Sequence, residues 1–356
     1  MTNDPTSSWT PVDANTSTQH ERDDATHAEQ AQEGRPYEVR IATKGLFGEL
    51  ISDRTGFIAA VFLVVVLVIA FAAPWIAPYG PVEGNPSTAR ISPIWDGGTW
   101  AHVFGTDAQG YDVLSRLMWG SRTTLLIGVV VVLVAGIFGV VVGLISGYRG
   151  GRTDRWLMRW VDMQVAFPGL LIALIMIAVI GASIKSLIFV LAFNAWMVFA
   201  RMTRGVVLSA KENPYVEAAE IVGCRPRRVM FLHILPNLTS SLATLAVLEF
   251  ARIILAEATL SFLGLGLQFP DVSLGLMASA GREAFFSLPR LAVIPGVFLT
   301  LIVLAVNFLS SWLRVATDPV EREKRHATSA KGITDKDAAK RARQAKRAAR
   351  LNEATS

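Results

Sequence analysis

The chain has almost no cysteine: Cys224 is the one cysteine among 356 residues. A single cysteine excludes a disulfide within the chain and a metal cluster built on several cysteines. The sequence also lacks a G-x-x-x-x-G-K-[ST] phosphate loop, because no glycine is followed directly by lysine, and it lacks an H-E-x-x-H zinc motif. We therefore expect a non-catalytic chain that binds no cofactor and no metal.

Charged side chains are also scarce, at 18% of the residues, whereas soluble domains have about 25%. A helix of about 20 apolar residues crosses a hydrocarbon core of about 30 Å, so long uncharged runs predict an all-α polytopic membrane protein. Five runs contain no Asp, Glu, Lys or Arg: residues 55–82, 123–148, 163–184, 229–248 and 291–313.

Six transmembrane helices are expected from these runs and their flanks. If the N-terminus lies inside, 26 of the 34 lysines and arginines fall on the cytoplasmic side and six on the exterior side. Cytoplasmic loops are enriched in Lys and Arg, so both termini are expected in the cytoplasm, and no nucleic-acid partner is needed to explain the net charge of +5. The expected spans are 57–78, 121–147, 160–181, 185–207, 237–267 and 290–313.

The composition divides the chain into four parts. The polar composition of residues 1–44 predicts a disordered cytoplasmic tail. Residues 45–120 are expected to hold a short interfacial helix, the first span and an extracytoplasmic segment. Residues 121–313 are expected to form a five-helix core with a cytoplasmic loop at 208–236. Residues 314–356 then form a basic cytoplasmic tail.

The most informative stretch is KENPYVEAAEIVGCRPRRVMFLHILPN, residues 211–237. Asn213 is suited to cap a helix, Pro214 to its first position, and Gly223 to the left-handed conformation after its last turn. Two adjacent alanines leave one surface of this helix nearly bare, so that another protein's backbone can approach it closely. These local features alone favour an ordinary cytoplasmic connector.

The same residues resemble the EAA loop of ABC importer permeases, through EAA at 217–219, the glycine that follows it, and Leu-Pro at 235–236. In that family the loop forms a coupling helix that docks into a cleft on the ATPase subunit. The resemblance implies that the residues coupling this chain to an ATPase are Glu217, Ala218, Ala219, Gly223, Leu235 and Pro236.

Further stretches resemble the dipeptide and oligopeptide branch of that family. This chain departs from the common pattern at Tyr111, where many relatives have arginine, and at Ser310 and Ser311, where a Gly-Asp pair is commoner. The resembling stretches are HILPN (233–237), FGTDAQGYDVLSRLMWGSRTTLLIG (104–128), EATLSFLGLGLQFP (257–270) and NFLSSWLRVATDP (307–319).

The resemblance implies a type I ABC importer permease of the bacterial inner membrane, which forms half of a translocation pathway for peptides. It implies three kinds of partner: a second permease subunit, cytoplasmic ABC ATPase subunits and an extracytoplasmic solute-binding protein. Import of nickel or another small solute is the alternative within the family. Outside it, the alternatives are a proton-coupled secondary transporter, with Glu249 or Glu257 as the proton carrier, and a membrane scaffold.

Three charged residues lie within the fifth expected span: Glu249, Arg252 and Glu257. An isolated charge at the centre of a membrane helix costs at least about 2.5–3.5 kcal/mol. Glu249 and Arg252 are spaced i, i+3, so we expect them to form an ion pair on one face of the helix. That pair either fixes helix packing or lines a pathway, whereas Glu257 is expected to hold helices together.

Overall fold

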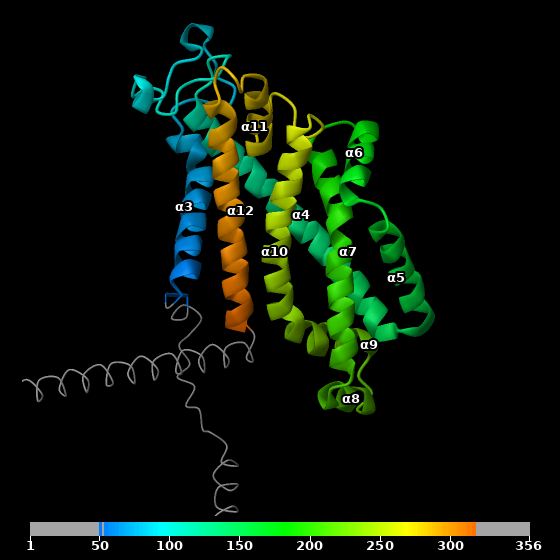
Figure 1. The fold of residues 1–356 in the computed structure, drawn as a ribbon. Coiled ribbons are helices and arrows are strands. Elements are labelled where there is room, and N and C mark those ends of the chain that lie inside the picture. The colour runs from blue at the N-terminus through cyan, green and yellow to red at the C-terminus, as the bar shows by residue number, and fades with distance from the viewer. Residues whose placement is uncertain (1–49, 52, 318–356) are drawn as a thin grey trace, which may run out of the picture. The chain divides into compact units, whose positions relative to one another are not determined.

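The computed structural model describes residues 50–51 and 53–317. Within these residues five helices are long and apolar enough to cross a membrane, and a sixth crossing results if a pair of helices bent by 84° is counted as one span. This confirms the predicted all-α membrane fold. The helices (Figure 1) are α3 (Arg54–Ile76), α4 (Val113–Arg149), α5 (Gly151–Val165), α6 (Gly169–Ile180), α7 (Ile184–Lys211), α8 (Pro214–Ile221), α9 (Pro226–Arg228), α10 (Leu235–Phe262), α11 (Leu274–Glu283) and α12 (Arg290–Thr317).

The predicted tails lie outside the described residues. This applies to residues 1–44, to the basic tail beyond Thr317, and to half of the interfacial helix expected at 45–56, whereas residues 314–317 of the predicted tail belong to α12. The first span is described from its start, where the side chain of Asp53 accepts hydrogen bonds from the amides of Thr55 and Gly56 and so caps α3.

The third predicted span, at 160–181, was wrong as a continuous helix. It is divided into α5 and α6, which meet at an angle of 84°. Pro168 precedes α6, and proline both lacks an amide donor and disfavours helical geometry in the residue before it. The polar residues of α5 have partners on α7, because Arg204 pairs with Asp154 and Arg201 pairs with Asp162.

Glycines bring α4 and α7 into close contact. A Cβ atom added at Gly143 would lie 2.5 Å from the carbonyl oxygen of Ala200, and one added at Gly139 would meet the carbonyl oxygen of Trp196. Small residues that recur every four positions let two membrane helices approach backbone to backbone. Gly139 and Gly143 therefore serve the α4–α7 interface.

Helix α10 lies between α12 and α7, and α4 crosses behind it (Figure 1). It ends at Phe262 rather than at the predicted residue 267, because Gly264 turns the chain with φ +81°.

The two ends of the bundle carry different elements. Helices α8 and α9 lie at the end where α3 begins and α12 stops, which we call the α8 end. The segment 77–112 and α11 lie at the other, which we call the cap end.

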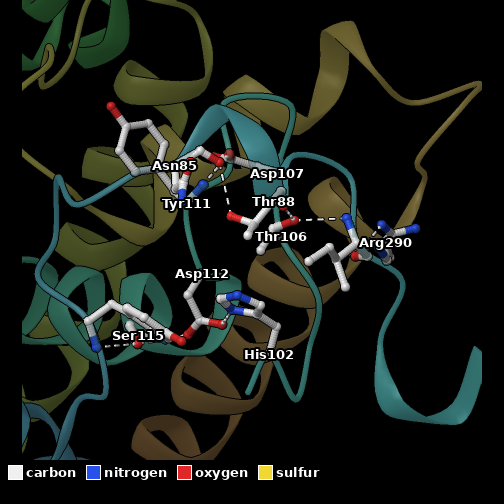
Figure 2. Close-up of polar contacts among 11 residues, drawn as sticks. Asn85, Thr88, His102, Thr106, Asp107, Tyr111, Asp112, Ser115 and Arg290 are labelled. Carbon is white, nitrogen blue, oxygen red and sulfur yellow. Dashed lines mark hydrogen bonds and ion pairs between the residues drawn. The ribbon is translucent and has the colours of Figure 1, made fainter. Parts of the chain in front are cut away.

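The cap segment 77–112 contains two short 3₁₀ helices, η1 (Pro86–Thr88) and η2 (Ile94–Asp96), and is held together largely by polar contacts (Figure 2). The buried Asp112 caps α4, because its Oδ2 accepts from the amide and the hydroxyl of Ser115 at 2.8 and 2.7 Å. Its Oδ1 lies 3.0 Å from Nδ1 of His102, and the ring of Tyr79 stacks on that imidazole. This cap explains why α4 begins at Val113 rather than at about residue 121.

Replacement of Asp112 by alanine is expected to destabilise the cap end. The change removes a helix cap and leaves the buried His102 without its partner, which together correspond to about 1–3 kcal/mol. We expect a lower melting temperature of the detergent-purified protein. The control is Asp96→Ala, because Asp96 is exposed in the same segment. Equal melting temperatures for the two variants would contradict the role given to Asp112.

Candidate functional site

The helix expected between the fourth and fifth spans is present as α8 (Pro214–Ile221), with Pro214 at its first position. Gly223 has φ +83°, as predicted for the residue that ends it. The predicted side-chain cap was wrong, although Asn213 occupies the cap position. Its Nδ2 donates instead to the carbonyl oxygens of Ser209 and Ala210, each at 3.3 Å. The side-chain amide of Asn213 therefore hydrogen-bonds the last turn of α7 rather than the first turn of α8.

The two alanines of α8 lie on different faces. Ala218 is exposed, whereas Ala219 is 8% exposed and packs inward beside Val216. The apolar cluster beneath α8 includes residues from α4, α7 and α10. The expectation that both alanines leave one outer surface bare is therefore corrected, because successive helix residues are about 100° apart. The buried members of this cluster are Leu144, Val207, Ala210, Val216, Ala219, Val229, Met230, Ile234 and Leu238.

Polar contacts also tie α8 to the spans on either side. The hydroxyl of Tyr148, at the end of α4, donates to Oε1 of Glu220 at 2.9 Å. Nδ2 of Asn237, in α10, donates to the hydroxyl oxygen of Tyr215 at 3.1 Å. Since α8 also follows α7 directly, it is connected to three membrane helices, α4, α7 and α10.

The outer face of α8 combines acidic and apolar side chains. Glu217 and Ala218 are exposed, and Ile221 and Val222 expose 79% and 82% of their surface. The sequence reasoning did not identify these two apolar residues. The signal was present, because two large aliphatic residues precede a left-handed glycine in an otherwise polar loop.

The remaining predicted coupling residues lie where the loop enters the membrane. Between α9 and α10 the chain forms a π-helical turn, η3 (Val229–Ile234). Leu235 and Pro236 follow it and open α10, Leu235 being half-buried and Pro236 exposed. Such π turns often occur at functional sites in helices. The structure thus places Glu217, Ala218, Ala219 and Gly223 in one short segment and separates Leu235 and Pro236 from it by α9 and η3.

The expected ion pair of the fifth span is present. Nη1 of Arg252 donates to Oε1 of Glu249 at 2.7 Å. The two side chains differ in environment, since Glu249 is 4% exposed and Arg252 is 65% exposed. The carboxylate thus lies inside the bundle, while the guanidinium lies at its surface.

Glu257 lies apart from this pair and is fully buried. Its carboxylate accepts hydrogen bonds from the hydroxyl of Thr124 in α4 at 3.3 Å and from the hydroxyl of Ser261 at 2.9 Å. The same Thr124 oxygen accepts the amide of Leu274 in α11 at 3.2 Å. Glu257 therefore lies at a junction of α4, α10 and α11, and within the described residues no three His, Cys, Asp and Glu side chains are grouped to hold a metal ion.

The bundle and its tethered surface helix define a multi-pass membrane subunit, and the sequence assigns it to a family. Residues 139–322 match the binding-protein-dependent transport system inner membrane component family, and residues 46–93 match the N-terminal TM domain of oligopeptide transport permease C. The chain belongs to the binding-protein-dependent transport system inner membrane component family. It is accordingly an integral, multi-pass inner-membrane protein.

Individual relatives cover most of the chain. The dipeptide transport system permease protein DppC of Escherichia coli (strain K12) is 42% identical over 268 residues, which are 75% of this chain and 89% of that protein. The protein of the same name from Haemophilus influenzae is 35% identical over 268 residues, 75% of this chain and 91% of its own. The glutathione transport system permease protein GsiD of Pectobacterium atrosepticum is 33% identical over 285 residues, which are 80% of this chain and 93% of that protein. A chain of the MetNI methionine ABC transporter, solved in inward-facing conformations, has a TM-score of 0.47 and 19% identity, covering 57% of this chain and 97% of that one.

Proposed function

We propose that this chain is the transmembrane permease subunit of an ATP-driven importer for peptides and forms half of its translocation pathway. The observation that supports this most strongly is α8, whose outer face exposes Glu217, Ile221 and Val222 while its inner face is anchored to three spans. Membership of a transport permease family and relatives named for dipeptide and glutathione transport support the peptide substrate. ATP hydrolysis is assigned to partner subunits.

The proposed orientation places the α8 end in the cytoplasm. Basic residues concentrate in the segments that follow α4 and α7 at this end of the bundle and, in the sequence, in residues 318–356, and cytoplasmic segments of membrane proteins are enriched in Lys and Arg. ATP is available only on that side. The cap end then faces the exterior, where a solute-binding protein delivers its ligand.

The proposed coupling is mechanical. Separate ATPase subunits close on ATP and move α8, whose outer face they hold. Because α8 is fixed to α4, α7 and α10 by its apolar cluster and by two side-chain hydrogen bonds, the spans move with it as a rigid body. A second permease subunit completes the pathway on the other side.

The proposed pathway runs along one side of α10, opposite α4. Ser310 of α12 donates to the carbonyl oxygen of Thr244 in α10, which sets how the two antiparallel helices face each other. Around the axis of α10, Arg252 lies roughly 80° from Thr244, and around the axis of α12, Asn307 lies roughly 60° from Ser310. Because the two helices are antiparallel, Arg252 and Asn307 lie on the same side of the helix pair. With the exposed Thr300 they form what we call the α10–α12 polar face. Polar side chains in a membrane face water or protein rather than lipid.

The division between α5 and α6 supports a pathway in the same bundle. Non-helical backbone at membrane depth is tolerated where it is buried in protein or lines a water-filled cavity. Phe167, at the break, is 64% exposed. Discontinuous helices of this kind line substrate pathways in transporters.

Reconstitution tests the function. The chain is purified with its partner ATPases, second permease and binding protein and placed in proteoliposomes. We expect uptake of a labelled dipeptide to require ATP on the α8 side and to be unaffected by a pH gradient alone. Uptake that follows the pH gradient without ATP would instead establish the secondary transporter, and uptake of nickel but not of dipeptide would change the substrate.

A further inference from the structure

Arg252 occupies a position that general membrane energetics disfavour. It lies about 15 Å from the end of α10, with 65% of its side chain exposed in this subunit. A guanidinium in contact with lipid at this depth costs at least about 2.5 kcal/mol. The exposed part of the Arg252 side chain is therefore expected to face a polar environment rather than lipid. A translocation pathway provides such an environment.

The ion pair uses only part of the hydrogen-bonding capacity of the Arg252 guanidinium. Arginine has five N–H donors in a planar fork, and the contact with Glu249 uses Nη1. Among the described residues no other acceptor binds Arg252. A fork of this kind binds a carboxylate through two parallel hydrogen bonds. The buried Glu249 fixes the direction in which the fork points.

An apolar hollow lies further along the same side of α10. Its volume is about 320 Å³, and its walls come from α10, α11 and α12. Thr259, at its edge, is seven residues beyond Arg252, which is about 10 Å along the helix and about 20° around it. An extended peptide covers that distance in about three residues. The lining residues are Ala258, Thr259, Phe262, Leu274, Gly275, Ala278, Ala292, Pro295, Gly296 and Leu299.

We propose that Arg252, held in place by Glu249, binds the C-terminal carboxylate of the transported peptide, and that the hollow receives an apolar side chain of the third residue counted from the C-terminus. This rests on the proposed function and adds a recognition site inside the permease. The two contacts give the peptide a direction, with its C-terminus toward the α8 end.

The test uses the complete importer in proteoliposomes, with peptides at concentrations that saturate the binding protein. The probes are Ala-Ala-Ala and its C-terminal amide. We expect Arg252→Gln to lower uptake of the free acid about tenfold or more while uptake of the amide is unchanged, and Arg252→Lys to restore part of the loss. Lys185→Gln is the control, because Lys185 is another exposed cation of the bundle and its loss leaves the ratio of acid to amide uptake unchanged.

The hollow is tested with Leu-Ala-Ala against Ala-Ala-Ala. A Cβ atom added at Gly296, which lines the hollow, meets nothing within 4 Å, so Gly296→Leu is chosen as the variant that narrows the hollow. We expect it to lower uptake of Leu-Ala-Ala several-fold more than uptake of Ala-Ala-Ala.

Three results would overturn parts of this proposal. If Arg252→Gln lowered uptake of the free acid and of the amide equally, the ion pair would be a packing element. If the variant left the ratio of acid uptake to amide uptake as it is in wild type, carboxylate recognition by Arg252 would be excluded. Equal effects of Gly296→Leu on both peptides would exclude the hollow as a side-chain site. Absence of ATP-dependent peptide uptake in the wild-type complex would overturn the proposed function itself.

Discussion

Glu217→Arg is expected to abolish ATP-driven uptake while leaving the protein folded and inserted. Glu217 is exposed on the outer face of α8, next to the apolar pair formed by Ile221 and Val222. Reversal of a charge at a docking surface costs several kcal/mol when like charges are brought together, and each 1.4 kcal/mol is a factor of ten. We expect uptake to fall at least about 100-fold and the ATPase subunits to co-purify poorly.

The matched control is Glu212→Arg, which reverses an exposed charge at the end of α7 outside α8. It should leave uptake and co-purification unchanged. Ile221→Asp provides an independent variant, because it places a charge where an apolar contact is expected at the centre of the interface. Normal uptake in both Glu217→Arg and Ile221→Asp would count decisively against α8 as the coupling element.

Gly143→Ala is expected to disrupt the contact between α4 and α7. The added methyl group would lie 2.5 Å from the carbonyl oxygen of Ala200 and 2.7 Å from Cβ of Thr203, and a backbone carbonyl has no alternative rotamer. Overpacking of this kind costs about 1–3 kcal/mol or more. We expect a clearly lower melting temperature and reduced yield of the detergent-purified protein, measured against wild type.

Gly136→Ala is the control on the same helix. A Cβ atom at Gly136 lies 3.6 Å from the ring of Phe199, an ordinary van der Waals distance. Both variants gain the same helix propensity, about 1 kcal/mol, so the difference between them reports the helix contact alone. If Gly143→Ala were as stable as Gly136→Ala, the α4–α7 packing described here would be incorrect.

The apolar runs and their flanks were sufficient to locate five membrane helices among the described residues, α3, α4, α7, α10 and α12, because a span must be about 20 apolar residues long whatever it packs against. Local chemistry was sufficient for α8 as well. Pro214 and Gly223 act on the backbone of their immediate neighbours, so the start and end of that helix follow from the chain itself. The pairing of Glu249 with Arg252 is similarly local, since the two residues are one helical turn apart.

Tertiary structure alone decided which residues of those helices face inward and which remain exposed. The third span divides in two before α6, which Pro168 precedes, and the polar residues of α5 have their partners on α7. Ala219 is buried and Ala218 exposed because α8 packs against α4, α7 and α10 on one side. Glu257 is satisfied by Thr124, which is 133 residues away in the sequence. The amino-acid sequence determines where helices form because that depends on neighbouring residues and on the bilayer, whereas burial depends on contacts between segments far apart in the chain.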